Sequence, residues 1–119
     1  MKNILSIFTV LSLLLIPITA FAGEGPMSLP SGAKPEAVSH NKEGIASWNK
    51  KDYKGALMHF SAASKIDGSS GEIHFNEAIC YDKIGQHGVA TKHFGVALKQ
   101  AGGNTKLLNS PILKGHLGM

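Results

Sequence analysis

The sequence "GALMHFSAASKIDG" at residues 55–68 returns in outline as "VATKHFGVALKQAG" at residues 89–102. When residues 37–70 are aligned with residues 71–104, nine of the 34 positions carry the same residue. Chance would give about two identities, so this interval indicates a duplicated structural unit. The identical pairs are His40/His74, Glu43/Glu77, Ile45/Ile79, Ala56/Ala90, His59/His93, Phe60/Phe94, Ala63/Ala97, Lys65/Lys99 and Gly68/Gly102.

The apolar residues inside each unit recur with the period of a helix. Ala56, Phe60 and Ala63 follow i, i+4, i+7 spacing, and the second unit repeats it. Turn signals, among them Asp52 as a candidate N-cap and Gly85, divide each unit into two helices. We expect helices at 35–50, 53–67, 71–84, 87–101 and 105–117, the last of them kinked or restarted at a proline, residue 111.

The pattern resembles the tetratricopeptide repeat (TPR) family, whose unit of about 34 residues is a helix–turn–helix. The small and aromatic positions of that family are filled in the two units by Gly44, Tyr53, Ala56, Phe60 and Ala63, and by Ala78, Tyr81, Gly85, Ala90, Phe94 and Ala97. Three kinds of departure occur. His40 and His74 stand at the usual Trp position, Lys51 stands at the turn Gly, and Gly68 and Gly102 replace the closing Pro.

The resemblance implies an all-α fold, a short α-solenoid in which helical hairpins stack side by side. Ala56 is small where the two helices of a hairpin approach, and Phe60 fills the space beside it. One hairpin cannot bury its own apolar face, so a neighbour must cover it. We therefore predict two repeats, residues 37–70 and 71–104, covered by a C-terminal capping helix at 105–117.

The first 22 residues have the pattern of a secretion signal peptide. A basic "MKN" start leads into apolar residues 4–16, Pro17 ends that run, and "AFA" at 20–22 matches a cleavage site. A retained membrane anchor is the alternative, although the run is short for a full span. We expect cleavage after Ala22 and a periplasmic or secreted protein of a Gram-negative bacterium, with no membrane contact afterwards.

The rest of the chain divides into a leader and a TPR domain. Residues 23–34, "GEGPMSLPSGAK", contain two Pro and three Gly without periodicity, and they predict a flexible leader ahead of a domain at 35–119. After cleavage, 11 lysines stand against 8 acidic residues, and the chain has no arginine. Scattered lysines without arginine argue against recognition of nucleic acid.

No group of residues in the sequence predicts catalysis. The acidic residues are dispersed and no GxSxG motif is present, so we expect neither an enzyme nor a cofactor. Cys80 is the one cysteine and lies between Ile79 and Tyr81 in a predicted helix. We expect it to be buried and inert, an intermolecular disulfide being the alternative.

Six histidines raise the question of metal binding. Four of them are repeat equivalents, which duplication explains, and no HxxxH or HExxH motif is present. His87 and His93 are close in sequence, but their spacing places them on different faces of a helix. Equivalent helices of stacked repeats lie about 10 Å apart, which disfavours bridging by one ion. The sequence therefore predicts structural or surface histidines and no metal site.

In the family that this chain resembles, the first helix of each repeat lines a concave groove. The resemblance places in that groove Val38, Asn41, Ile45, Trp48, Asn49, Glu72, Phe75, Ile79, Asp82 and Lys83, joined from the cap by Asn109, Leu113 and His116. Several of these side chains are large and apolar, and apolar patches with polar rims mark contact sites. The Lys, Asn and Arg set with which the family holds acidic C-termini is incomplete here, so an apolar segment such as a helix is the expected ligand.

The resemblance therefore implies a non-enzymatic adaptor or assembly factor that binds a partner protein in its groove. An alternative occupant is the chain itself, with Trp48 and Phe75 packed on each other or on the leader. Such patches also form homodimers, so a self-assembling structural role is a second alternative. A histidine-based metal or haem carrier is a third.

Overall fold

The computed structural model describes residues 23–119, and the predicted signal peptide at 1–22 lies outside the described residues. Within residues 23–119 the chain forms helices and no strand, which confirms the all-α prediction. The helices are α2 (Pro35–Asn49), α3 (Tyr53–Ile66), α4 (Gly71–Lys83), α5 (His87–Lys99), α6 (Thr105–Leu108) and α7 (Pro111–Leu117). None of these helices combines the length and the apolar character that crossing a lipid bilayer requires.

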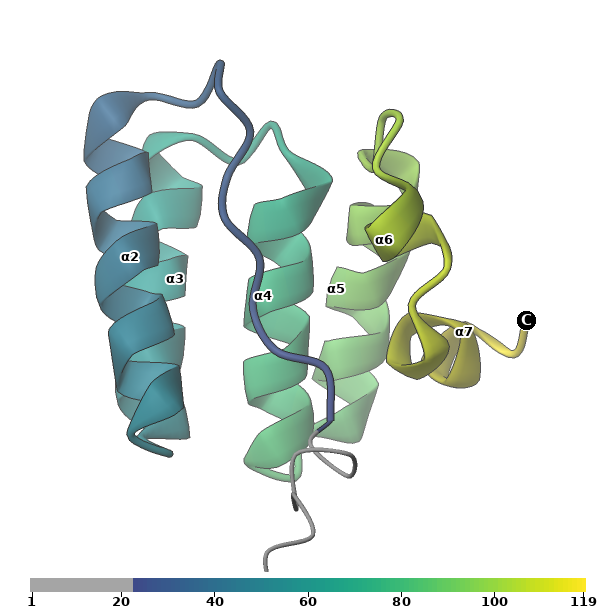
Figure 1. Cartoon of the computed structure of the whole chain (residues 1–119). Coiled ribbons are helices and arrows are strands. Elements are labelled where there is room, and N and C mark those ends of the chain that lie inside the picture. The colour runs from purple at the N-terminus through teal and green to yellow at the C-terminus, as the bar shows by residue number, and fades with distance from the viewer. Residues whose placement is uncertain (1–22) are drawn as a thin grey trace, which may run out of the picture.

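The helices pair into two antiparallel hairpins, α2 with α3 and α4 with α5. α3 packs on α4, which joins the hairpins, and the short helices α6 and α7 pack on the second hairpin. Figure 1 shows α2, α4 and α6 on the near side, with α3 and α5 behind them. Residues 23–34, which we call the leader, run across this near side over α4. The architecture is the short helical-repeat solenoid that the 34-residue period predicts.

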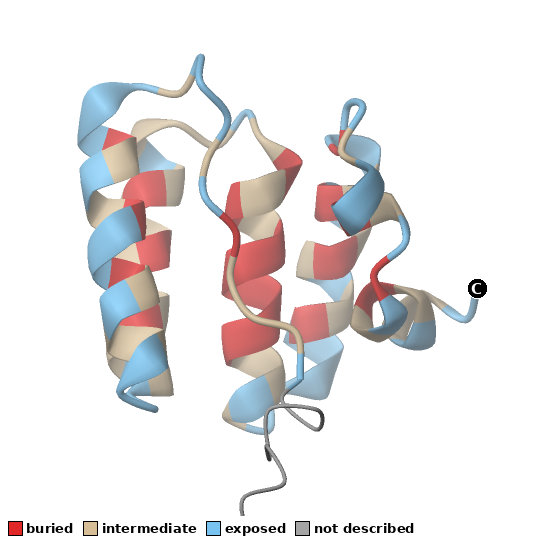
Figure 2. Ribbon diagram, viewed as in Figure 1, coloured by how far each residue is buried: buried red, intermediate tan, exposed pale blue. Residues whose placement is uncertain are grey.

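The repeated small and aromatic residues form the packing between helices. Ala56, Phe60 and Ala63 are fully buried, and so are their equivalents in the second repeat, Ala90, Phe94 and Ala97. A Cβ atom added at Gly44 would lie only 2.5 Å from the Phe60 ring, so α2 and α3 approach too closely there for a side chain. The buried residues gather on the inner sides of the helices and along α4 (Figure 2).

Polar side chains cap four of the helices at their N-termini. Asp52 accepts a hydrogen bond from the Gly55 backbone amide at 2.9 Å, as predicted. Ser70, Asn104 and Ser110 do the same for α4, α6 and α7. Each cap satisfies a backbone donor that has no partner within its helix, so the sequence itself sets these helix starts.

The predicted capping helix at 105–117 is not one helix but two. α6 ends at Leu108, and α7 begins at Pro111, where a ring without an N–H fits the first turn of a new helix. Ser110 accepts a hydrogen bond from the Leu113 amide at 3.2 Å and caps that new start. The prediction of one continuous helix at 105–117 was therefore wrong, and the predicted restart at Pro111 is confirmed.

The leader is also different from the expected flexible segment. It forms no helix, in agreement with its lack of periodicity, but Met27 within it is 94% buried, since only 6% of its surface is exposed. Its backbone is hydrogen-bonded to side chains of α2 and α4. Contacts far along the chain, which a local pattern does not encode, fix this segment on the repeats.

Candidate functional site

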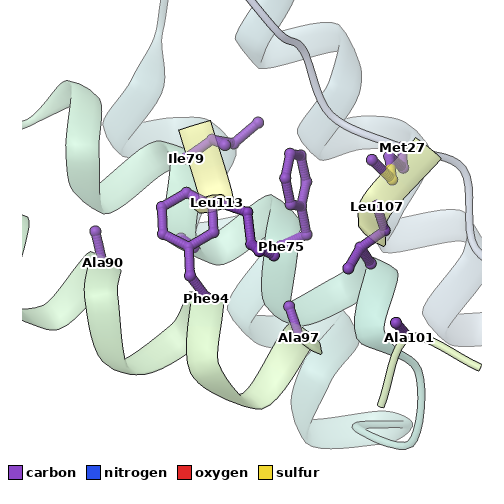
Figure 3. Packing of buried hydrophobic residues seen from close by; sticks show 10 residues of the cluster. Met27, Phe75, Ile79, Ala90, Phe94, Ala97, Ala101, Leu107 and Leu113 are labelled. Carbon is purple, nitrogen blue, oxygen red and sulfur yellow. The ribbon is translucent and has the colours of Figure 1, made fainter. Parts of the chain in front are cut away.

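The leader lies on the near side of the repeats, which we call the groove (Figure 1), and the one buried residue of the leader, the anchor, is Met27. Its side chain belongs to the same core cluster as Phe75, Phe94 and Leu107. In Figure 3 Met27 lies beside Leu107, with the Phe75 and Phe94 rings further into the cluster. Phe75 and Phe94 meet edge to face with ring centroids 5.6 Å apart. The anchor therefore extends the core of the second hairpin instead of resting on its surface.

Two buried asparagines hold the backbone of Met27. Asn76 accepts a hydrogen bond from the Met27 amide at 2.7 Å and donates one to the Met27 carbonyl at 2.8 Å. Asn41 donates a second bond to that carbonyl at 3.0 Å, and Asn76 also donates to the Asn41 side-chain oxygen at 2.8 Å. Asn41 and Asn76 are almost completely buried, at 1% and 0% exposure. These hydrogen bonds involve main-chain atoms of Met27, so they favour an extended backbone whatever its side chains are. Selectivity for a side chain comes from the apolar packing of the anchor residue.

Contacts on both sides of Met27 hold the rest of the leader. Upstream, Glu24 accepts a hydrogen bond from the Ile112 amide in the first turn of α7 at 2.8 Å. Downstream, Leu29 packs against the core of the first hairpin. At the end of the leader, the Lys34 amide donates to Asp67 at 3.0 Å. The leader thus bridges the cap, the second repeat and the first repeat.

The residues predicted to line the groove fall into three groups. Asn41, Phe75, Ile79 and Leu113 are buried. Val38, Ile45, Trp48, Glu72, Asp82 and His116 are half-buried, and Asn49, Lys83 and Asn109 are exposed. Phe75 lies in the same core cluster as Met27 of the leader, and Trp48 packs against that cluster. Binding of a partner at these residues stays a prediction.

An aromatic corner lies at the C-terminal ends of α2 and α4. The Trp48 and Tyr53 rings meet edge to face with centroids 4.8 Å apart. The Lys83 ammonium lies 5.9 Å from the Trp48 ring centroid and 5.5 Å from that of Tyr53, within reach of a cation–π interaction. Trp48 also packs against both core clusters, so it is partly structural.

Sequence reasoning missed two residues of the groove, Met27 and Asn76. Met27 lies in a segment rich in Pro and Gly, where the pattern gave no reason to expect burial. A signal existed for Asn76, because it interrupts the apolar stretch of a helix that is otherwise predicted to be core. A buried amide needs hydrogen-bond partners, and an extended segment is one way to supply them.

The histidines, for which the sequence predicts structural or surface roles, converge into groups in the folded chain. All six fall into three groups with one carboxylate each, and within a group the candidate ligand atoms lie within 4.8 Å of one another. We name them the first-repeat cluster (His40, Glu43, His59), the second-repeat cluster (His74, Glu77, His93) and the cap cluster (Asp82, His87, His116). His40 and His59, like His74 and His93, meet between the two helices of one hairpin and not between equivalent helices of successive repeats, whereas His87 of α5 meets His116 of α7.

The cap cluster is a closed hydrogen-bond network. The Asp82 carboxylate is hydrogen-bonded to the His87 ring at 2.9 Å and to the His116 ring at 2.8 Å. His116 is also hydrogen-bonded to the Thr91 hydroxyl at 2.9 Å. Burial alone would raise the pKa of Asp82, but the hydrogen bonds from His116 and His87 outweigh it and hold the pKa below its ordinary value. This network ties α7 to α4 and α5.

The second-repeat cluster is the most buried of the three. The Glu77 carboxylate raises the pKa of His74, whereas burial lowers the pKa of His93. Cys80, one turn beyond Glu77, is fully buried and belongs to no candidate metal group of the described residues. Burial, and then the charge of Glu77, raises the pKa of its thiol to about 12, so the thiolate is suppressed at neutral pH.

Comparison with known proteins gives one informative similarity. No family model matches this chain. Over 65 residues the chain is 38% identical to Sperm-associated antigen 1 of Homo sapiens, a match that covers 55% of this chain. The similarity indicates TPR-like helical repeats, in agreement with the two stacked hairpins. This chain spans only 7% of the length of that protein, so the similarity concerns the repeat unit and not the whole of its relative.

Proposed function

We propose that this chain is a non-enzymatic interaction adaptor whose groove binds an extended segment of a partner protein. The observation that carries the proposal is the docking of the leader. Asn41 and Asn76 are hydrogen-bonded to the backbone N–H and C=O of Met27, while the Met27 side chain packs into an apolar cluster. These contacts recognise a main chain and one flexible apolar residue, and any segment with those features can make them.

The bound leader sets the expected chemistry of the partner. An extended segment fits the groove better than the helix that the resemblance implied, because the asparagines reach main-chain atoms whose hydrogen bonds a helix would already use. The partner segment would carry a Met- or Leu-like residue, with small residues around it as in "GPMSL". It must compete with the leader, whose local concentration is high because it belongs to the same chain.

The location and role complete the proposal. If residues 1–22 act as a signal peptide, the adaptor works in the periplasm or outside the cell and has no membrane contact after cleavage. A similarity to a TPR-containing protein supports an interaction role in general and names no partner. A self-assembling alternative has one specific support: a leader could make the same contacts in the groove of a second copy, by exchange of identical segments.

A labelled peptide with the sequence of residues 23–34 tests the proposal. In the Met27→Asp variant the leader's anchor carries a charge that the apolar cluster excludes, so the groove should open and bind the peptide in fluorescence anisotropy. The unaltered chain should bind the same peptide much more weakly. Adding Asn41→Ala to the open variant should remove binding while circular dichroism stays helical.

The matched control is a peptide in which the Met27 position is Asp, which should not bind the open variant. Equal binding of both peptides, or binding that ignores Asn41→Ala, would contradict the proposed groove. Light scattering on the unaltered chain separates the alternative, since leader exchange predicts a dimer whose fraction grows with concentration and is lost in Met27→Asp.

A further inference from the structure

The second-repeat cluster brings three metal-ligand side chains to one point inside the second hairpin. His74 and Glu77 are three residues apart on α4 and therefore share a helix face, and His93 reaches them from α5. The Glu77 carboxylate oxygen Oε1 lies 3.5 Å from His74 Nδ1 and 3.9 Å from His93 Nδ1. Nothing in the groove or the leader requires this convergence.

The atoms that face each other in this cluster are buried and have no hydrogen-bond partner. The Glu77 side chain is only 7% exposed, and its Oε1 atom is unpaired, as are the Nδ1 atoms of His74 and His93. Buried polar atoms are almost always paired, and leaving a charged one unpaired costs more than leaving a neutral one. A positive centre between these three unpaired atoms would stabilise all of them.

The tautomer of His74 strengthens this point. Its Nε2 atom lies 2.8 Å from the Gly68 carbonyl oxygen, which can only accept, so Nε2 carries the proton. In the neutral ring, Nδ1 then presents a lone pair to the Glu77 carboxylate, and two acceptors face each other. A histidine that binds a metal through one nitrogen usually donates its other N–H to a backbone carbonyl in this way.

The carboxylate is oriented by a similar outer contact. Glu77 Oε2 accepts a hydrogen bond from the Ser61 hydroxyl of α3 at 3.3 Å, which leaves Oε1 free to face the histidines. Ligating carboxylates are held by such bonds in metal sites. Ser61 lies on α3 and Gly68 lies in the loop between α3 and α4, so both outer contacts come from outside the second hairpin. The stacking of the repeats therefore positions the ligand atoms.

We propose that His74, Glu77 and His93 bind a divalent first-row transition-metal ion, for which Zn²⁺ is the representative. Two imidazoles and one carboxylate are a zinc ligand set that leaves a fourth position open, and they do not suit Mg²⁺ or Ca²⁺. With metal–ligand distances of about 2.0–2.2 Å, tetrahedral ligand atoms lie about 3.4 Å apart. The two Oε1–Nδ1 distances, 3.5 Å and 3.9 Å, are close to that spacing, and all three ligand atoms lie within 4.8 Å of one another.

The repeat carries a second copy of the site. His40, Glu43 and His59 are the equivalents of the three ligands, and these three pairs are among the nine identities between the units. Glu43 lies 3.0 Å from His59 and 3.7 Å from His40, but its side chain is 55% exposed. Solvation lowers the gain from binding an ion there, so the first-repeat cluster is the weaker site. The cap cluster differs, because Asp82 is already hydrogen-bonded to both histidines.

Isothermal titration of the full chain with Zn²⁺ tests the proposal. We expect one tight site, and a loss of affinity of 10-fold or more in Glu77→Gln. Gln fits the same space and can donate to His74 Nδ1, so this variant should keep its fold without metal. His87→Ala in the cap cluster is the matched control and should bind as the unaltered chain does. Co²⁺ in place of Zn²⁺ should give the visible absorption of a tetrahedral site, which Glu77→Gln loses.

A second measurement does not depend on any variant. Zn²⁺ at a hundredfold excess over its dissociation constant should raise the Tm of the unaltered chain by on the order of 10 °C, and a chelator should reverse the rise. A proton shared between His74 and Glu77 is the rival positive centre. The absence of a zinc heat and of a Tm shift would overturn the metal site in favour of that proton. A zinc heat and Tm shift that persist unchanged in Glu77→Gln would overturn it by showing that zinc binds at other residues.

Discussion

Lys51 shows how a single residue departs from its repeat equivalent at a cost in stability. Its φ of 63° lies in the left-handed region, and it is the one non-glycine residue with positive φ among residues 23–119. The equivalent residue 34 positions later is Gly85, whose φ is 86°. Both residues turn the chain between the two helices of a hairpin, but only glycine does so without a steric penalty from Cβ.

Lys51→Gly is therefore expected to stabilise the fold by about 1 kcal/mol, because it removes the strain of a side chain in the left-handed region. Urea unfolding followed by circular dichroism measures the change. The matched control is Gly85→Ala, which should destabilise the second hairpin by a similar amount. A stabilising Gly85→Ala, or a destabilising Lys51→Gly, would show that the two turns are not equivalent.

At the scale of elements, the cap depends on one carboxylate at the end of α4. Asp82 holds His116 of α7 and His87 of α5, and these are the titratable groups that face it in the cap cluster. Its pKa is below the ordinary value, so its charged form stabilises the folded state. That contribution is complete above the unfolded pKa of about 3.9 and is lost as pH falls through the lower folded pKa.

Asp82→Asn should consequently reduce the free energy of unfolding near neutral pH by less than about 1 kcal/mol, since the group is partly solvated and its interactions are screened. The difference from the unaltered chain should shrink as the pH falls below about 4. Urea titrations across that pH range measure it. A difference that stays constant with pH would mean that Asp82 acts through packing and not through its charge.

The elements also show what the sequence could and could not predict. The helix starts at Asp52 and Ser70 and the buried Ala and Phe positions were predictable, because caps and helical periodicity are local signals. The histidine clusters were not, because His40 meets His59 and not His74. The 34-residue repeat relates residues on equivalent helices of successive repeats, whereas His40 and His59 are in contact between the two helices of one hairpin.

At the scale of the whole molecule, the leader changes the meaning of the groove. A hydrogen bond between Met27 and Asn76 joins residues 49 positions apart, and no pattern in a Pro- and Gly-rich segment announces such a contact. The predicted groove residues Phe75 and Ile79 lie on the predicted helix, and they are buried in the same core cluster as Met27 of the leader. Under the proposed function, a partner segment would therefore have to compete with the leader for the groove.

The central claim, that the leader occupies the groove, is tested most directly by hydrogen exchange of the Met27 amide. This amide is buried and donates to Asn76 at 2.7 Å, so NMR of the unaltered chain should show slow exchange there. Exposed Ser28, the next residue, provides the internal reference. Slow exchange at Met27 that becomes fast in Asn76→Ala, with helical amides still protected, is the predicted result. Exchange of Met27 in the unaltered chain at the rate of an unstructured peptide would contradict the account.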